Sequence, residues 1–255
     1  MKIYFIRHGE TPAVKEGLAQ GQSNDIELNT LTSVGVEQLE KTATELVEIL
    51  KEKGVSAENV KLYHCDDKRC TQSAYIVYKA LFEAGLLLNE NEQVLDVSGR
   101  NYGEIEGLNE SKIRDMSNLL KPMRKEFKLL WSYLLSEFGF SNPAGIEKKS
   151  GYDKKVEEKV LYQLFDDYEP DQTIIIVGNS DVFNVLQKNK SIRKYLYFGN
   201  EYMEGKKVKF PKIKIKPGEM VDFELEPLPE GYETVAEMMM HPGESIDYAF
   251  YMGVR

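Results

Sequence analysis

The feature that most constrains the fold is an unbroken run of apolar, β-branched residues, Thr173-Ile174-Ile175-Ile176-Val177. Such a run is typical of a central strand that is covered on both faces, because neither face alternates with polar residues. Two further short apolar runs extend from Lys2 to His8, just before Gly9, and from Val60 to Cys65. Each of them predicts another buried strand.

Amphipathic helices are predicted between these strands. Apolar residues recur at helical spacing over about 32–53 and over 74–82, and glycines follow both stretches. Strands that alternate with helices predict an α/β sandwich with a largely parallel sheet. Two further helical stripes, over 123–138 and 156–165, are interpreted as helices packed on the sheet, with a loop over 141–150 between them.

The C-terminal third shows a different pattern. Apolar residues alternate with lysines over 213–216 and with acidic residues over 221–225, on either side of Pro217-Gly218. Proline followed by glycine is typical of a type II turn, so these residues predict a hairpin. We expect a single domain over 1–255, with a helical insert at about 108–170 and a tail after about 226 that has no assignable pattern.

Charge and composition argue against several classes of protein. The chain carries 33 Lys and Arg against 42 Asp and Glu, a net charge of −9, so it repels nucleic acid unless its basic residues cluster. No run approaches about 18 consecutive apolar residues, the length that a membrane-spanning helix needs, and the apolar start from Ile3 to Ile6 is too short for a signal peptide. The expected location is the cytoplasm. Cys65 and Cys70 are too few for a disulfide framework.

The clearest chemical signal is Arg7-His8-Gly9-Glu10-Thr11, at the end of the first strand. In an open α/β sheet, ligands bind beyond the carboxyl ends of the strands. An arginine there can hold a phosphate through two parallel hydrogen bonds, and the histidine beside it can attack phosphorus. Gly9 allows close approach of the backbone to a ligand. The alternative is a histidine packed at the strand end, with Arg7 in a surface ion pair.

Several segments, in this order, resemble the histidine phosphatase superfamily, which includes phosphoglycerate mutases and many phosphomonoesterases. They are Arg7-His8-Gly9-Glu10-Thr11, Leu31-Thr32-Ser33-Val34-Gly35-Val36-Glu37-Gln38, Lys68-Arg69-Cys70-Thr71-Gln72-Ser73-Ala74, Arg100-Asn101-Tyr102-Gly103-Glu104-Ile105-Glu106-Gly107, Gly178-Asn179-Ser180-Asp181 after its strand, and Pro217-Gly218-Glu219. The resemblance runs from residue 1 to about 225. Together with the strand and helix pattern, it predicts a three-layer α/β/α sandwich around a mixed, mostly parallel sheet.

The resemblance implies a role for each matching residue. His8 would be the nucleophile that accepts the phosphoryl group, and Arg7 and Arg69 would bind the phosphoryl oxygens and stabilise their charge. Four further residues of these segments are expected to contact the substrate: Gly9, Thr11, Arg100 and Asn179.

Two positions depart from the family's pattern. The family's acid, a glutamate, falls on Gly99, and its second histidine, which completes the phosphate pocket, falls on Asn179. Asn179 can still donate one amide hydrogen bond, without the charge. A general acid must reach the leaving oxygen, and Asp181 is the preferred substitute, because one branch of the superfamily places its acid in the loop after this strand. Glu104 and Glu106 are the alternatives.

The expected function is hydrolysis of a phosphomonoester through a phosphohistidine on His8. No metal or other cofactor is expected, because the arginines supply the positive charge. Mutase activity is disfavoured, since the acid and the second histidine are absent. A second hypothesis is a catalytically impaired homologue that binds a phosphorylated ligand or a protein partner, and a third is an unrelated α/β domain. The expected partner is a small phosphorylated molecule rather than nucleic acid or a membrane.

Overall fold

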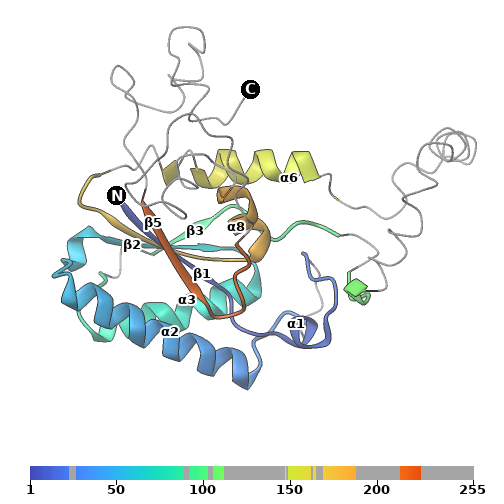
Figure 1. Cartoon of the computed structure of the whole chain (residues 1–255), viewed down its shortest axis with the longest axis horizontal. Helices are drawn as coiled ribbons and strands as arrows, with labels where there is room; N and C mark the ends of the chain where they lie inside the picture. Colours follow the sequence, from blue (N-terminus) through green and yellow to red (C-terminus); the bar gives the residue numbers. More distant parts are fainter. Residues whose placement is uncertain are drawn as a thin grey trace, which may run out of the picture.

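The structure is a computed structural model of the whole chain, and its arrangement is shown in Figure 1. The residues that it describes are 1–22, 27–88, 92–102, 106–111, 147, 149–161, 163–164, 169–187 and 213–224. The predicted helix over 123–138 and the tail after 226 lie outside these ranges, as does most of the predicted insert.

Five strands form one mixed sheet in the order β3-β2-β4-β1-β5. Their bounds are β1 Lys2–Arg7, β2 Val60–Cys65, β3 Glu92–Leu95, β4 Thr173–Gly178 and β5 Met220–Glu224. The first four strands are parallel to one another, and β5 runs antiparallel to β1. β4 lies in the centre and all six of its residues are buried, which confirms the prediction of a strand covered on both faces.

Helices cover both faces of this sheet. Their bounds are α2 Ser33–Glu52 and α3 Lys68–Glu83 on one face, and α6 Lys149–Val156 and α8 Ser180–Leu186 on the other (Figure 1). Alternate residues of β4 serve the two cores, since Ile175 belongs to the cluster with Leu39 and Val77, whereas Ile176 belongs to the cluster with Phe183. The predicted three-layer α/β/α sandwich is therefore confirmed.

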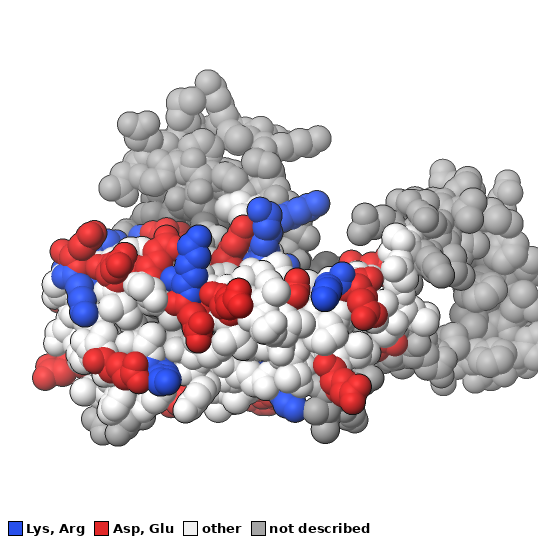
Figure 2. Space-filling view, turned by 90° about the horizontal axis from the view of Figure 1, so that it is seen from below, with Lys and Arg blue, Asp and Glu red and all other residues white. Residues whose placement is uncertain are grey.

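The outer surface of α2 and α3 is a solvated, mixed-charge face. Figure 2 views the molecule from this side and shows acidic and basic side chains interspersed among neutral ones. On α2, glutamates recur with lysines along the side that faces away from the core. The described residues on this face therefore form no continuous basic patch.

The predicted hairpin around Pro217-Gly218 is wrong, although the turn is confirmed by the φ of +72° at Gly218. Residues 213–216 form no strand, and β5 pairs with β1 instead. β1 would otherwise leave unpaired backbone groups along the edge of the sheet. An opposite-charge pair joins β1 and β5, where the Lys2 ammonium is 2.6 Å from the Asp222 carboxylate.

Two short elements leave no clear periodic signal in the sequence. α1 (Pro12–Glu16) is little more than one helical turn, and β3 has a single buried residue, Leu95. α6 begins inside the predicted loop of 141–150, and the π-helical segment Glu157–Leu161 that follows falls within the predicted helix over 156–165.

Among the described residues, no helix has the length and apolarity that crossing a membrane requires.

The first turn of α2 touches the loop after β1 backbone to backbone. A methyl group on Gly35 would lie 2.7 Å from the amide nitrogen of Glu10, closer than real Cβ atoms come. We expect Gly35→Ala to lower the free energy of unfolding by about 1–3 kcal/mol, because the two backbones must separate. A thermal melt would show this as a lower Tm.

Gly151→Ala is the matched control, since Gly151 is exposed in α6 and no heavy atom lies within 4 Å of an added methyl group. Alanine there should leave the Tm unchanged, or raise stability by up to about 1 kcal/mol. Equal melting temperatures for Gly35→Ala and wild type would contradict the backbone contact.

Candidate active site

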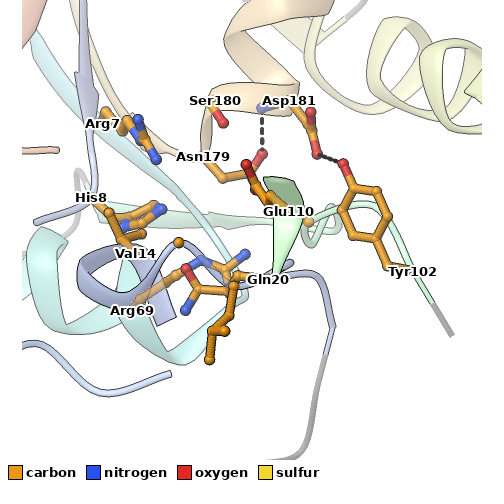
Figure 3. Close-up of a pocket in the computed structure, with 13 residues that line it drawn as sticks. Arg7, His8, Val14, Gln20, Arg69, Tyr102, Glu110, Asn179, Ser180 and Asp181 are labelled. Carbon is orange, nitrogen blue, oxygen red and sulfur yellow. Dashed lines mark hydrogen bonds between the residues drawn. The ribbon is translucent and has the colours of Figure 1, made fainter. Parts of the chain in front are cut away.

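A cavity of about 220 Å³ opens at the carboxyl ends of β1 and β4. Figure 3 shows the side chains that line it. The cavity brings together five residues predicted from sequence, which come from the end of β1, the first turn of α3 and the junction of β4 with α8: Arg7, His8, Arg69, Asn179 and Asp181.

His8 lies at the end of β1 as a buried, neutral imidazole. Its backbone amide donates to the carbonyl of Gly178 at 2.9 Å, and its side chain is 3% exposed. Nδ1 donates to the carbonyl of Gly9 at 2.8 Å, which leaves the lone pair on Nε2. Burial lowers the pKa of His8 well below its ordinary value, and the charges of Arg69 and Arg7 lower it further. The lowered pKa favours the neutral ring at neutral pH.

Two guanidiniums flank this imidazole and each retains an unused donor. Nη1 of Arg7 donates to the carbonyl of Ile215 at 2.8 Å, and Nη1 of Arg69 donates to the Gly21 carbonyl at 3.0 Å and to Oδ1 of Asn29 at 2.8 Å. The Nε atoms of both arginines are buried and have no hydrogen-bond partner among the described residues. Burial and the nearby charge of Arg69 lower the pKa of Arg7. Polar groups this deeply buried are normally paired, so both guanidiniums have unused hydrogen-bonding capacity next to the imidazole.

Three residues predicted to contact substrate do not line the cavity. The amide of Gly9 donates to the Ser73 hydroxyl at 3.2 Å, and its close approach is to the backbone of Gly35 rather than to the cavity. Thr11 is fully buried as the N-cap of α1. Arg100 donates through Nε to the Glu147 carbonyl at 2.9 Å. Their predicted substrate contacts remain predictions.

Carboxylates form the opposite wall of the cavity. Oδ2 of Asp181 accepts a hydrogen bond of 3.0 Å from the Tyr102 hydroxyl (Figure 3), and burial together with the charge of Asp181 raises the pKa of Tyr102. Of the alternative acids, Glu106 does not line the cavity, because it accepts from the amides of Gln22 and Tyr102. Glu104 lies outside the described residues.

Glu110 also lines this wall and was not identified from sequence. It follows Asn109, which forms an isolated antiparallel bridge with Leu18 just after α1. This bridge between distant segments brings Glu110 to the cavity, and no local sequence pattern predicts such a bridge.

Among the described residues, no group of three or more histidine, cysteine or acidic side chains is arranged to hold a metal ion.

A second missed residue, Asp67, joins the two positions that depart from the family's pattern. Its Oδ2 accepts from the amide of Gly99 at 2.7 Å and from Nδ2 of Asn179 at 3.2 Å, and lies 3.3 Å from Nη2 of Arg69. Burial raises the pKa of Asp67 despite these partners. In sequence Asp67 is an ordinary helix N-cap, yet its side chain makes no capping bond to α3.

Asn179 is committed to the protein through both ends of its amide. Oδ1 accepts from the backbone amides of Asp181 and Val182, at 3.1 and 3.0 Å, and so caps α8. Nδ2 donates one hydrogen to Asp67. One Nδ2 hydrogen remains for a ligand.

Comparison with known proteins identifies a family. The sequence profile of the histidine phosphatase superfamily (branch 1) matches residues 3–131. No curated protein matches the chain.

The chain is also similar to several solved structures. The crystal structure of TTHB049 from Thermus thermophilus has a TM-score of 0.50 at 16% identity, over 89% of this chain and 95% of that one. A putative alpha-ribazole-5'-P phosphatase from Escherichia coli K-12 has a TM-score of 0.47 at 20% identity, over 74% and 79% of the two chains. The mycobacterial glucosyl-3-phosphoglycerate phosphatase Rv2419c, complexed with VO3, has a TM-score of 0.46 at 19% identity, over 73% and 79%.

The state of His8 can be measured directly. Because its pKa is lowered by burial and by two guanidiniums, we expect a neutral ring at pH 6 with its proton on Nδ1. Long-range ¹H–¹⁵N NMR of the histidine side chains over pH 5–8 reports both the charge of the ring and the nitrogen that carries the proton. In the unfolded chain the ring takes up a second proton near pH 6.5. Because the folded chain resists this protonation, the free energy of unfolding should fall as the pH drops below that value. A charged ring at pH 6, or a proton on Nε2, would contradict the geometry.

Proposed function

Because the chain belongs to the histidine phosphatase superfamily, we propose that it hydrolyses a small phosphomonoester through a phosphohistidine on His8. The observation that carries this proposal is a neutral imidazole that lines one cavity together with the guanidiniums of Arg7 and Arg69. A phosphoryl group brings anionic oxygens to those guanidiniums and an electrophilic phosphorus to the imidazole.

The reaction takes two steps at one phosphorus. Nε2 of His8 attacks in line with the ester oxygen, so that a P–N bond forms and the P–O ester bond breaks. Arg7 and Arg69 offset the charge on the remaining phosphoryl oxygens. Water then attacks the phosphohistidine, which releases inorganic phosphate and restores the neutral ring. No step requires a metal ion, because the guanidiniums carry the positive charge.

Asp181 is the proposed donor of the proton that the leaving oxygen needs. It lies across the cavity from His8 (Figure 3), and Tyr102 fixes one of its oxygens at 3.0 Å. The other oxygen is left to carry the proton to the leaving oxygen in the first step and to take a proton back from the attacking water in the second.

A second candidate function is binding of a phosphorylated ligand without turnover. The observation that favours it is the state of Asn179, whose amide caps α8 and donates to Asp67, so that it offers a phosphate one uncharged donor. Gly99 supplies no acid. Binding of inorganic phosphate without hydrolysis of any phosphomonoester would support this candidate.

Replacement of the nucleophile separates the two candidates. We expect wild type to hydrolyse an aryl phosphate between pH 4 and 8 with EDTA present, and His8→Ala to retain less than about a thousandth of that rate. Equal turnover by both proteins would contradict the role of His8, and loss of wild-type activity in EDTA would contradict metal-independent catalysis.

His64→Gln is the control for this experiment. His64 lies at the end of β2 with the same local geometry, since its Nδ1 lies 2.9 Å from the carbonyl of the next residue, Cys65. It does not line the cavity. We therefore expect His64→Gln to keep wild-type turnover.

The general acid can be identified from the leaving group. Asp181→Asn should lower kcat/KM for alkyl phosphates by about 10²–10⁴-fold. The effect on aryl phosphates should be much smaller, because an aryl oxide leaves without a proton. Glu110→Gln is the comparison, since Glu110 lines the same wall. The same selective loss in Glu110→Gln, and not in Asp181→Asn, would assign the proton to Glu110.

A further inference from the structure

The catalytic scheme does not use Asp67, although this carboxylate lies directly behind the cavity. Its side chain is 5% exposed, and it is absent from the cavity lining. A ligand in the cavity therefore does not touch Asp67, which can position a ligand only through the groups that it contacts. Burial makes the ionised form less favourable than in water, which is why the pKa of Asp67 is raised. A charge held at such a cost points to a role beyond packing.

One of the contacts of Asp67 is with the guanidinium of Arg69. Nη1 of Arg69 donates to Gly21 and Asn29, and Nη2 lies 3.3 Å from Oδ2 of Asp67. The guanidinium is thus held through both terminal nitrogens, and its Nε–H is left without a partner. Because an arginine side chain has many rotamers, this fixation keeps the guanidinium in the cavity wall before a ligand arrives.

Gly99 makes room for this arrangement. A methyl group at Gly99 would lie 2.6 Å from Nη2 of Arg69. The φ of Gly99 is not in the left-handed region that requires glycine, so the constraint comes from the space that the guanidinium occupies. The amide of Gly99 also donates to Asp67 at 2.7 Å, so one glycine serves both partners.

We propose that Asp67 is a positioning residue, which fixes Arg69 and Asn179 with their remaining donors toward the phosphoryl group, and that Gly99 must be glycine because Asp67 holds the guanidinium against it. The proposal rests on the phosphate site proposed above. It accounts for the two departures from the family's pattern, Gly99 and Asn179, as parts of one hydrogen-bonded cluster around a single carboxylate.

The direction in which phosphate affinity changes distinguishes a positioning role of Asp67 from an effect of its charge alone. Removing a negative charge near an anion site strengthens anion binding if charge alone acts, whereas loss of positioning weakens it. We expect Asp67→Asn, checked for folding by circular dichroism, to raise the Kd for inorganic phosphate by about 10–100-fold, the range found when a supporting residue around a bound metal is removed. The KM for an aryl phosphate should rise in parallel.

Asp66→Asn is the matched control. Asp66 is the adjacent residue, but it is exposed, and its carboxylate accepts from the Ser98 hydroxyl at 2.6 Å. The same change of charge there should leave the phosphate Kd unchanged or slightly lower. An unchanged or lower Kd in folded Asp67→Asn, with wild-type binding intact, would overturn the role of Asp67 alone. Absence of phosphate binding by wild type would overturn both proposals.

Gly99→Ala tests the other side of the cluster and serves where Asp67→Asn does not fold. The added methyl group should displace the guanidinium and raise the phosphate Kd at least about tenfold, whereas Gly151→Ala should not change it. In the double variant with Asp67→Asn, the alanine should add little, because the guanidinium is already released. Wild-type affinity in folded Gly99→Ala, or additive effects in the double variant, would overturn the proposal.

Discussion

The parallel pairing of β1 with β4 continues one residue past the end of β1, where the amide of His8 donates to the carbonyl of Gly178 at 2.9 Å. This bond places His8 near the N-cap of α8, so that His8 and Asn179 face one cavity although they are distant in sequence. β4 ends in glycine because a methyl group there would lie 2.9 Å from the ring of Phe5. The cavity thus depends on two central strands that can pack this closely.

The sequence carries enough information for the layers but not for every partner. β2 and β4 are recognisable because burial on both faces produces a local apolar run, and α2 because its buried residues recur at helical spacing. The alternation over 221–225 predicts the strand β5 but not its pairing partner. β5 pairs with β1 rather than with 213–216 because β1 offers an open sheet edge, and β1 is far away in the chain.

The residues of the cavity region also differ in how far the sequence alone identifies them. His8, Arg7 and Arg69 follow from motifs at strand and helix ends, where the fold places ligands. Asp67 does not, because an aspartate before a helix is the usual N-cap, and only the structure shows its side chain turned toward Gly99 and Asn179.

The Gly9 and Gly35 contact has a mechanical consequence. A methyl group on Gly9 would lie 2.9 Å from the carbonyl carbon of Gly35, so no side chain separates the loop after β1 from α2. Side chains can change rotamer and absorb a displacement, but two touching backbones cannot. This side of the cavity is therefore rigid. Under the proposed function, differences in substrate size would have to be accommodated by the side chains of the facing wall, Tyr102, Glu110 and Asp181.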